Sequence, residues 1–248
     1  MELRTLPYSS NSAYANMAID HSILESVSEG DSHMTLRLYS WKPSAVSIGR
    51  FQSLRKEVNV EQCKVAGIDL VRRMTGGGAV YHDSEGEITY SLIAKEEELP
   101  QGVQKCYRYA ASMIIDALGS IGVKAEYAPI NDIVVDGRKI SGNAQTRREG
   151  AVLIHGTVIY KADVKKMFSV LNVSKEKLSN KTINSAEDRI TDVQTNSHAS
   201  IGELREALFN SFTRGRVWKE MPLTKEEKER SLELEETVYK NEEWNFNR

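Results

Sequence analysis

The sequence predicts an α+β fold in which mixed or antiparallel sheets are flanked by helices. Short apolar runs with the alternation of β-strands recur along the 248 residues. Several of these runs are separated by hairpin-like turns, and helical patterns are interspersed among them irregularly, which is typical of α+β proteins. No internal repeat or low-complexity linker divides the chain. We therefore expect a single domain over residues 1–248.

The helices are predicted from apolar residues that recur on one face. Asn11 or Ser12 can cap the first helix, which ends near Gly30. The range 104–121 gives the strongest helical pattern. The other helical ranges are 60–66, 163–171, 201–212 and 225–239.

The strands are predicted from alternation and from the turn residues between them. Strands are expected over 35–39, 45–49, 68–73, 79–82, 87–94 and 151–160. Asp136-Gly137 lies between two further strand-like runs and predicts a type I′ hairpin, because both central positions of that turn favour positive φ. The range 172–200 is polar and its structure is ambiguous.

Composition limits the class of protein. The chain is 40% hydrophobic and 27% charged, with a net charge of −2, which argues against a dedicated nucleic-acid binder. No apolar run has the length of a membrane helix, and the N-terminus lacks the apolar region of a signal peptide. Cys63 and Cys106 form neither a disulfide framework nor a credible metal site, so a reducing cytoplasm is expected.

The most informative stretch runs from Arg72 to Asp83 and contains three consecutive glycines between two apolar runs. Residues without a Cβ let the backbone approach a ligand closely. Two arginines directly upstream can supply positive charge for a carboxylate or a phosphate. The alternative is a tight turn with solvated arginines. A second polar cluster later in the chain favours the ligand-binding interpretation.

That second cluster is the predicted hairpin around Asp136-Gly137. Its arms carry the polar residues Asn131, Asp132, Lys139, Ser141 and Asn143. In a regular strand, Lys139, Ser141 and Asn143 share one face. Such a face beside apolar neighbours indicates the wall of a site. An exposed hairpin with a solvated polar face is the alternative.

Together these motifs resemble the lipoate-protein ligases, within the wider biotin and lipoate ligase superfamily. The matching stretches are 16–20, 36–41, 46–52, 72–83, 89–91, 131–132, 137–145, 155–157, 189–193 and 243–245. They follow one another in the order found in the family and span nearly the whole chain. The resemblance implies a class II biotin/lipoyl ligase-like catalytic domain, with mixed or antiparallel sheets flanked by helices.

The resemblance implies a reaction in two steps. ATP activates the carboxylate of lipoate as lipoyl-AMP, and a lysine of an acceptor domain then attacks the mixed anhydride. Because a carboxylate and a phosphate repel one another, positive charge is needed between them. The family lysine that contacts the acyl adenylate corresponds to Lys139. The family arginine at the adenylate or phosphate site corresponds to Arg72, so both residues are expected to be catalytic.

The resemblance also implies the residues that bind the substrates. Thr75, Gly76, Gly77 and Gly78 are expected to wrap the acyl chain and phosphate, and Val80, Tyr81, His82 and Asp83 to line the adenine pocket. Asn131, Ser141, Gly142 and Ala144 are expected beside the nucleotide, together with Lys139. Asp132 is expected to bind Mg²⁺, which takes one carboxylate plus nucleotide oxygens. His155 and Thr157 lie on one side of a strand and are expected to line the site, with His155 as a hydrogen-bonding group.

The implied partners are lipoyl-acceptor domains, namely E2 subunits of 2-oxoacid dehydrogenases or the glycine cleavage H protein. Larger ligases continue past the Trp-Asn motif into an accessory domain. This chain stops at Arg248, so we expect a catalytic domain that works with a separate accessory subunit. A second departure is the stretch 82–91, which is one residue longer than the family pattern and carries Glu87 near the position of an asparagine.

Three alternatives remain open. An octanoyltransferase of the same superfamily moves its acyl group through a cysteine thioester without ATP. No cysteine lies after Cys106, which disfavours that mechanism. A biotin ligase is disfavoured because its Gly-Arg-Gly-Arg-type loop is absent. A non-catalytic lipoyl-domain binder is disfavoured because Arg72, Asp132 and Lys139 are all present.

Overall fold

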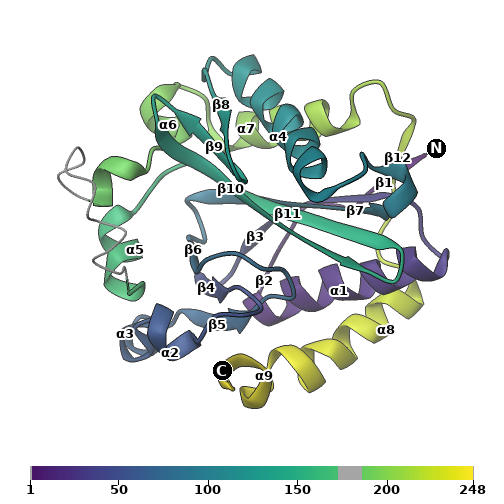
Figure 1. Cartoon of the computed structure of the whole chain (residues 1–248), viewed down its shortest axis with the longest axis horizontal. Coiled ribbons are helices and arrows are strands. Elements are labelled where there is room, and N and C mark those ends of the chain that lie inside the picture. Colours follow the sequence, from purple (N-terminus) through teal and green to yellow (C-terminus); the bar gives the residue numbers. More distant parts are fainter. Residues whose placement is uncertain (1, 173–185, 248) are drawn as a thin grey trace.

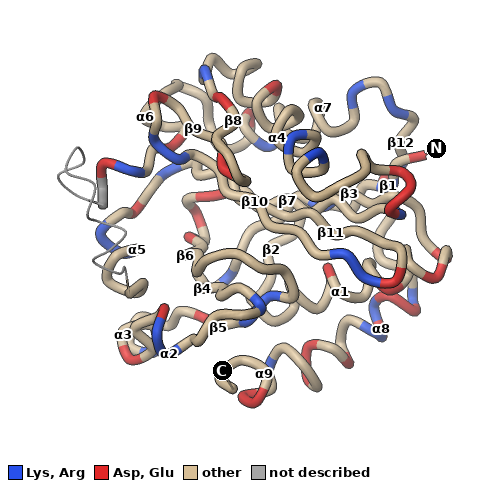
Figure 2. The backbone as a smooth tube through the Cα atoms, in the orientation of Figure 1, with Lys and Arg blue, Asp and Glu red and all other residues tan. Residues whose placement is uncertain are grey.

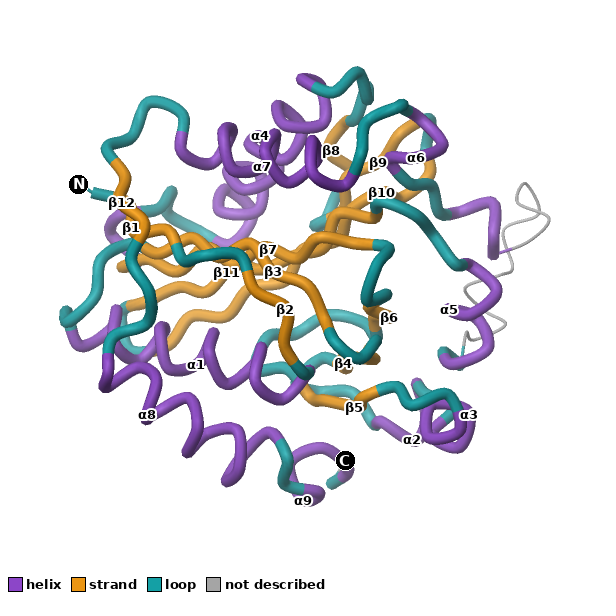
Figure 3. The backbone as a smooth tube through the Cα atoms, turned by 180° about the vertical axis from the view of Figure 1, so that it is seen from behind, coloured by secondary structure: helices purple, strands orange, loops and turns teal. Residues whose placement is uncertain are grey.

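The computed structural model describes residues 2–172 and 186–247 and confirms the α+β class (Figure 1). Within these residues, the strands form one large sheet and one small sheet. Helices cover both faces of the large sheet, and the small sheet lies beyond one end of it (Figures 1 and 3).

The large sheet contains nine strands among the described residues. Its order is β12 (Trp218–Glu220), β1 (Leu3–Thr5), β3 (Thr35–Trp41), β7 (Glu87–Lys95), β11 (Ala151–Ile159), β10 (Arg138–Arg148), β9 (Asp132–Val135) and β8 (Glu126–Ala128), and β2 (Ser9–Asn11) pairs with β3. The strands from β3 to β8 pair in antiparallel fashion, whereas β1, β2 and β12 join in parallel. The sheet is therefore mixed.

The small sheet positions the glycine-rich stretch. Its order is β5 (Asp69–Arg72), β4 (Ala45–Ile48) and β6 (Val80–His82). The central strand β4 pairs in parallel with β5 and antiparallel with β6. Residues 73–79 connect β5 to β6, so the three glycines lie at the edge of this sheet.

The principal helices pack on the two faces of the large sheet. These are α1 (Ala13–Glu29), α4 (Val103–Ser120), α7 (Ile201–Thr213) and α8 (Lys225–Leu234). Figure 3 shows α4 with α7 on one face and α1 on the other, with α8 outside α1. Shorter helices are α2 (Leu54–Glu57), α3 (Val60–Val65), α5 (Val164–Val170), α6 (Val193–Asn196) and α9 (Glu242–Phe246). Acidic and basic residues alternate along the outer helix α8 (Figure 2).

The alternation of β7 explains the two apolar layers. Ile88, Tyr90 and Leu92 point toward α4 and α7 and join the largest core cluster. Ile93 points the opposite way and packs with Ile23 and other apolar residues of α1. Burial of apolar area on both faces is the main stabilisation of such a sheet.

The local signals for helix ends and for the hairpin are confirmed. The Ser12 side chain accepts a hydrogen bond from Ala15, and Gly30 ends α1 at φ 92°. Asp136 and Gly137 have φ angles of 50° and 75°, as a type I′ turn requires. The predicted range 225–239 differs, because α8 ends at Leu234 and is followed by a turn of π-helix, Glu235–Tyr239.

Part of the ambiguous range 172–200 lies outside the described residues, which resume at Ala186. The described residues contain no helix long and apolar enough to cross a membrane.

Candidate active site

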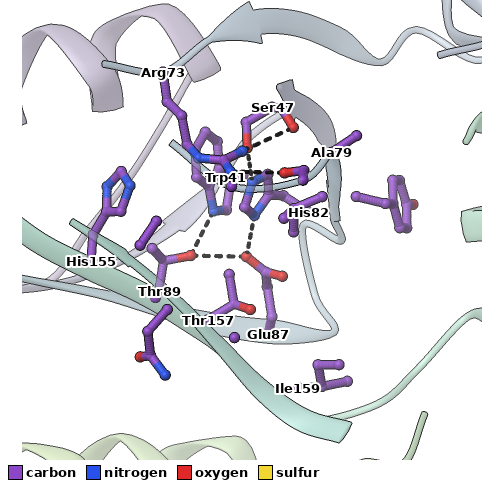
Figure 4. Close-up of a pocket in the computed structure, with 18 of the residues that line it drawn as sticks. Trp41, Ser47, Arg73, Ala79, His82, Glu87, Thr89, His155, Thr157 and Ile159 are labelled. Carbon is purple, nitrogen blue, oxygen red and sulfur yellow. Dashed lines mark hydrogen bonds and ion pairs between the residues drawn. The ribbon is translucent and has the colours of Figure 1, made fainter. Parts of the chain in front are cut away.

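A cavity of about 240 Å³ opens where the small sheet meets β10 and β11 of the large sheet. Strands from both sheets contribute side chains to its wall (Figure 4). Eleven of the residues expected from the sequence line it: Gly77, Gly78, Val80, Tyr81, His82, Asn131, Lys139, Gly142, Ala144, His155 and Thr157. The two polar clusters, far apart in the sequence, are thus brought to one cavity.

Six other expected residues do not line the cavity: Arg72, Thr75, Gly76, Asp83, Asp132 and Ser141. Asp132 and Thr75 each contact a lining residue, since Asp132 pairs with Lys139 and Thr75 bonds to His155. Gly76 belongs to the loop beside the cavity, and its carbonyl accepts a hydrogen bond from Arg73. Asp83 accepts hydrogen bonds from the Tyr81 hydroxyl and the backbone of Glu85, which fixes the turn after β6.

Lys139 contributes a positive charge to the wall of the cavity. Its Nζ lies 2.7 Å from Oδ1 of Asp132, and both side chains are about two-fifths exposed. The side chain crosses Gly142, where an added Cβ would lie 2.7 Å from Nζ. Gly142 is therefore required for this position of the lysine. An exposed pair of this kind is weak in itself, so the ammonium can exchange Asp132 for an anionic ligand.

Ser141 does not share a face with Lys139, contrary to the expectation from alternation. The pairing of β9 and β10 shifts register between these two residues, because a bulge interrupts the ladder. Ser141 is fully buried as a result, and its hydroxyl has no hydrogen-bond partner among the described atoms.

Asn143 also lies in the wall of the cavity. Its Nδ2 donates to the carbonyl of Asn131 at 2.8 Å, and the Asn131 side chain donates back to the carbonyl of Asn143. The Tyr90 hydroxyl donates to Oδ1 of Asn143. This pair of amides joins the two arms of the hairpin at the mouth of the site. Asn143 was visible in the polar motif, but the sequence did not distinguish it from its neighbours.

Arg72 lies outside the cavity, so the structure does not support the catalytic role expected for it. The side chain is buried and donates to the carbonyls of Gln52, Trp244 and Asn245. Its backbone N–H donates to the Asn245 side chain, and its carbonyl accepts from the Trp244 indole. Arg72 thus fastens helix α9 to the end of β5.

Arg73 is the arginine that faces the cavity, because adjacent residues of a strand point in opposite directions. It donates to the hydroxyls of Ser47 and Thr75, each at 3.1 Å. It also donates to the carbonyls of Gly76 and Gly78 at 2.7 and 2.8 Å. Burial lowers the pKa of Arg73 to about 10, which leaves it charged at neutral pH. The buried charge therefore shapes the glycine loop.

The loop itself depends on Gly77, whose φ is 95°. An added Cβ there would lie 2.8 Å from the Arg73 guanidinium. A side chain would thus be strained by the backbone angle and would press on the group that organises the loop.

His155 lies between Thr75, which also accepts from Arg73, and a buried carboxylate. Its Nε2 lies 2.7 Å from the Thr75 hydroxyl, and its Nδ1 lies 3.4 Å from Asp20. Burial lowers the pKa of His155 despite the neighbouring Asp20, which favours the neutral ring. Burial alone would raise the pKa of Asp20, but the Arg37 guanidinium and the hydrogen bonds from His155 and Ser91 hold that pKa below its usual value.

His82 is held by a second network, shown in Figure 4. Its Nδ1 lies 2.7 Å from Glu87 and its Nε2 lies 2.8 Å from the Ser47 hydroxyl. The ring stacks on Trp41, with centroids 4.0 Å apart. Thr89 donates to Glu87 and accepts from the Trp41 indole. Ser47, Trp41, Glu87 and Thr89 were not predicted as site residues, although each falls within or beside a stretch that resembles the family.

Neither cysteine lines the cavity. Both are buried, Cys63 in α3 and Cys106 in α4. Burial raises the pKa of Cys63 to about 11 and also raises that of Cys106. These thiols therefore lack both the position and the ionisation of a nucleophile.

A metal ion would have few protein ligands. The described residues contain no group of three or more His, Cys, Asp or Glu side chains suited to hold one. Asp132 offers a half-exposed carboxylate at the cavity mouth. Such an arrangement fits an ion that arrives bound to phosphate oxygens, because Mg²⁺ keeps several non-protein ligands.

Comparisons with known proteins agree on the superfamily and divide on the reaction. The model of the lipoyl protein ligase A/B catalytic domain matches residues 12–213. Octanoyltransferase LipM of Brevibacillus brevis is 33% identical, over 94% of each chain. The bi-partite lipoate protein ligase of Thermoplasma acidophilum has 30% identity and a TM-score of 0.87, covering 99% of this chain and 96% of that one. A lipoate-protein ligase A bound with ATP has 30% identity and a TM-score of 0.86, over 99% of each chain.

Proposed function

The chain belongs to the lipoyl protein ligase A/B catalytic domain family, and on this premise we propose that it is an ATP-dependent lipoate-protein ligase. It forms lipoyl-AMP from lipoate and ATP and transfers the lipoyl group to a specific lysine of a lipoyl-acceptor domain. The observation that carries the proposal is a cavity with a cationic mouth at Lys139 and no cysteine in its wall.

The cavity has the two kinds of surface that the first step needs. Apolar atoms of Met17, Trp41 and Ile159 line its interior and suit an acyl chain. Lys139, Asn131 and Asp132 lie together at the hairpin, where the carboxylate and phosphates would meet. Lys139 would leave Asp132 and bridge the two anions, which lowers the repulsion between them and the energy of the transition state.

The other residues would orient rather than react. Arg73 holds the glycine loop, whose backbone would enclose the acyl phosphate. Asn131 and Asn143 fix the hairpin arms and hold Lys139 near that loop. A magnesium ion bound to the nucleotide would neutralise phosphate charge, with Asp132 as its protein ligand once Lys139 has moved.

The second step requires a partner. The acceptor lysine enters from the exposed mouth beside Lys139, and its amine attacks the carbonyl of lipoyl-AMP with release of AMP. The T. acidophilum lipoylation system consists of a bi-partite lipoate protein ligase and its E2 lipoyl domain. By this analogy we propose E2 or glycine cleavage H domains as acceptors and a separate accessory subunit for this chain.

A second candidate is the octanoyltransferase, which the curated relatives favour. Two LipM proteins are 32–33% identical over 94% of this chain. We rank this candidate second because the sequence holds two cysteines, both are buried, and neither borders the cavity. A thioester intermediate on cysteine would need a large rearrangement of α3 or α4.

The test is incubation of the purified protein with lipoate, ATP and Mg²⁺, followed by mass spectrometry of the small molecules. The ligase forms lipoyl-AMP and pyrophosphate. A reaction that forms neither, while octanoyl groups move from an acyl carrier protein to an acceptor domain without ATP, would establish the second candidate instead.

A further inference from the structure

Ser47, His82 and Glu87 form a hydroxyl–imidazole–carboxylate chain in the wall of the cavity. The two links are 2.8 Å from Ser47 Oγ to His82 Nε2 and 2.7 Å from His82 Nδ1 to Glu87 Oε1. All three residues line the cavity, and all three are at least 95% buried. From this geometry we propose that Ser47 is a nucleophile that accepts a medium-chain acyl group as an ester, without ATP.

The hydrogen bonds fix the direction of proton movement. A carboxylate only accepts, so Nδ1 of His82 carries the proton that faces Glu87. In the singly protonated ring, Nε2 is then an acceptor, and the Ser47 hydroxyl donates to it. This is the tautomer and orientation in which an imidazole takes the proton of an attacking serine.

Arg73 donates a hydrogen bond to Ser47 Oγ. A guanidinium has donors only, so its 3.1 Å contact uses a lone pair of Ser47 Oγ and leaves the hydroxyl proton for His82. The positive charge beside Oγ also stabilises the negative charge that develops there. Trp41 stacks on the imidazole, and Thr89 holds Glu87. Residues outside the Ser47–His82–Glu87 series therefore hold these three side chains in place.

A second hydrogen-bonded series, Thr75–His155–Asp20, is less suited to this reaction. Thr75 takes the place of the serine, but it does not line the cavity, and the distance from His155 to Asp20 is 3.4 Å. The two chains meet at Arg73, which bonds to both hydroxyls. Of these two hydroxyl residues, only Ser47 lines the cavity.

The proposed reaction is balanced with a thioester as donor. Ser47 Oγ bonds to the carbonyl carbon, its proton moves to His82 Nε2, and the C–S bond breaks as the leaving thiolate takes that proton. The acyl group now forms an ester with Ser47. An amine or water then attacks the ester carbonyl, the C–O bond to Ser47 breaks, and a proton returns to Oγ through His82. No oxidant, reductant or nucleotide is needed.

This inference rests on the proposed function only in assuming that the cavity binds a medium-chain acyl group. It gives the fold an ATP-independent route to acyl transfer that does not use cysteine. It also accounts for a site that joins features of a ligase with close likeness to octanoyltransferases.

The test is incubation with octanoyl-coenzyme A without ATP, followed by intact-mass analysis and peptide mapping. We expect one octanoyl group on Ser47, unchanged in a Cys63→Ser, Cys106→Ser protein and in the matched control Ser112→Ala, an exposed serine of α4. Ser47→Ala should abolish the ester. Glu87→Gln should slow its formation by about 10²-fold, with an unchanged melting temperature as evidence of folding.

Absence of an adduct on the wild-type protein, or an adduct mapped to any residue other than Ser47, would overturn the proposal, even where Ser47→Ala fails to fold. The ligase assay is independent of this result. A protein that forms lipoyl-AMP but no Ser47 ester refutes the inference alone, whereas a Ser47 ester without lipoyl-AMP refutes the ligase proposal alone.

Discussion

Arg72 and Arg73 are adjacent in the chain but serve opposite sides of β5. Arg72 donates to carbonyls of the 49–52 loop and of α9, whereas Arg73 organises the glycine loop at the cavity. The sequence indicates that positive charge is needed here, and both arginines satisfy that pattern. Alternation indicates that the two side chains point in opposite directions. It does not reveal which of them faces the cavity, because that depends on the packing of the distant C-terminal segment.

The hydrogen bonds of Arg72 to buried carbonyls indicate that it stabilises the fold. Arg72→Met would leave several buried carbonyls without a donor, at a cost of about 2–3 kcal/mol in the free energy of unfolding. Urea denaturation measures this cost, with Arg55→Met, an exposed arginine of α2, as the matched control. An unchanged midpoint together with lost adenylation would instead restore the catalytic role first expected for Arg72.

Lys139 is the residue on which the ligase reaction depends most. Lys139→Ala should lower lipoyl-AMP formation by about 10²–10³-fold, since a positioned charge at the reacting groups is removed. The fold should survive, because the side chain is about two-fifths exposed. Single-turnover assays measure the rate, and circular dichroism with the control Lys64→Ala reports folding. Normal adenylation by a folded Lys139→Ala protein would refute this assignment.

At the scale of elements, long periodic segments and the short apolar strands β4, β5 and β6 were predictable, whereas four other short strands were not. The helix 104–121 and the hairpin at Asp136-Gly137 appear as expected, because their periodicity and turn chemistry are local. Strands β1, β2, β8 and β12 are three residues long each, and three of them pair in parallel with distant partners. No local pattern specifies such pairing. The bulge in β10 also has no local sequence signal, so Ser141 was predicted on the wrong face of the strand.

The contact between α1 and the C-terminal helices should depend on pH. Burial lowers the pKa of His21 to about 4, although Glu25 opposes this shift, and Arg148 and Arg230 add to it. The unfolded chain binds this proton near the usual pKa of about 6.5, whereas the folded chain does not. Stability is therefore complete above that value and falls as pH drops toward 4, by up to about 3 kcal/mol.

Denaturation curves measured between pH 4 and 7 test this effect. His21→Gln should flatten the decline, because glutamine does not titrate, while His33→Gln, at an exposed position before β3, should leave it unchanged. A decline that is equally steep in the His21→Gln protein would assign the pH dependence to other groups.

At the scale of the whole molecule, the cavity is assembled from two sheets. Its glycine loop and its lysine hairpin come from segments about 60 residues apart. Loops of this kind often need support to close around an adenylate. We therefore expect weak adenylation by this chain alone and restoration by an accessory protein of roughly 80–120 residues. Full-rate ligation by the purified single chain would contradict the need for a partner.

The central claim is that this site activates a carboxylate with ATP and needs no cysteine. The most direct measurement is the mass of a lipoyl-acceptor domain after incubation with lipoate, Mg²⁺, the accessory protein and a Cys63→Ser, Cys106→Ser protein, with and without ATP. We predict a lipoyl adduct on one acceptor lysine that appears only with ATP. An acceptor that stays unmodified with this protein, but is modified by the parent from an octanoyl carrier protein without ATP, would contradict the claim.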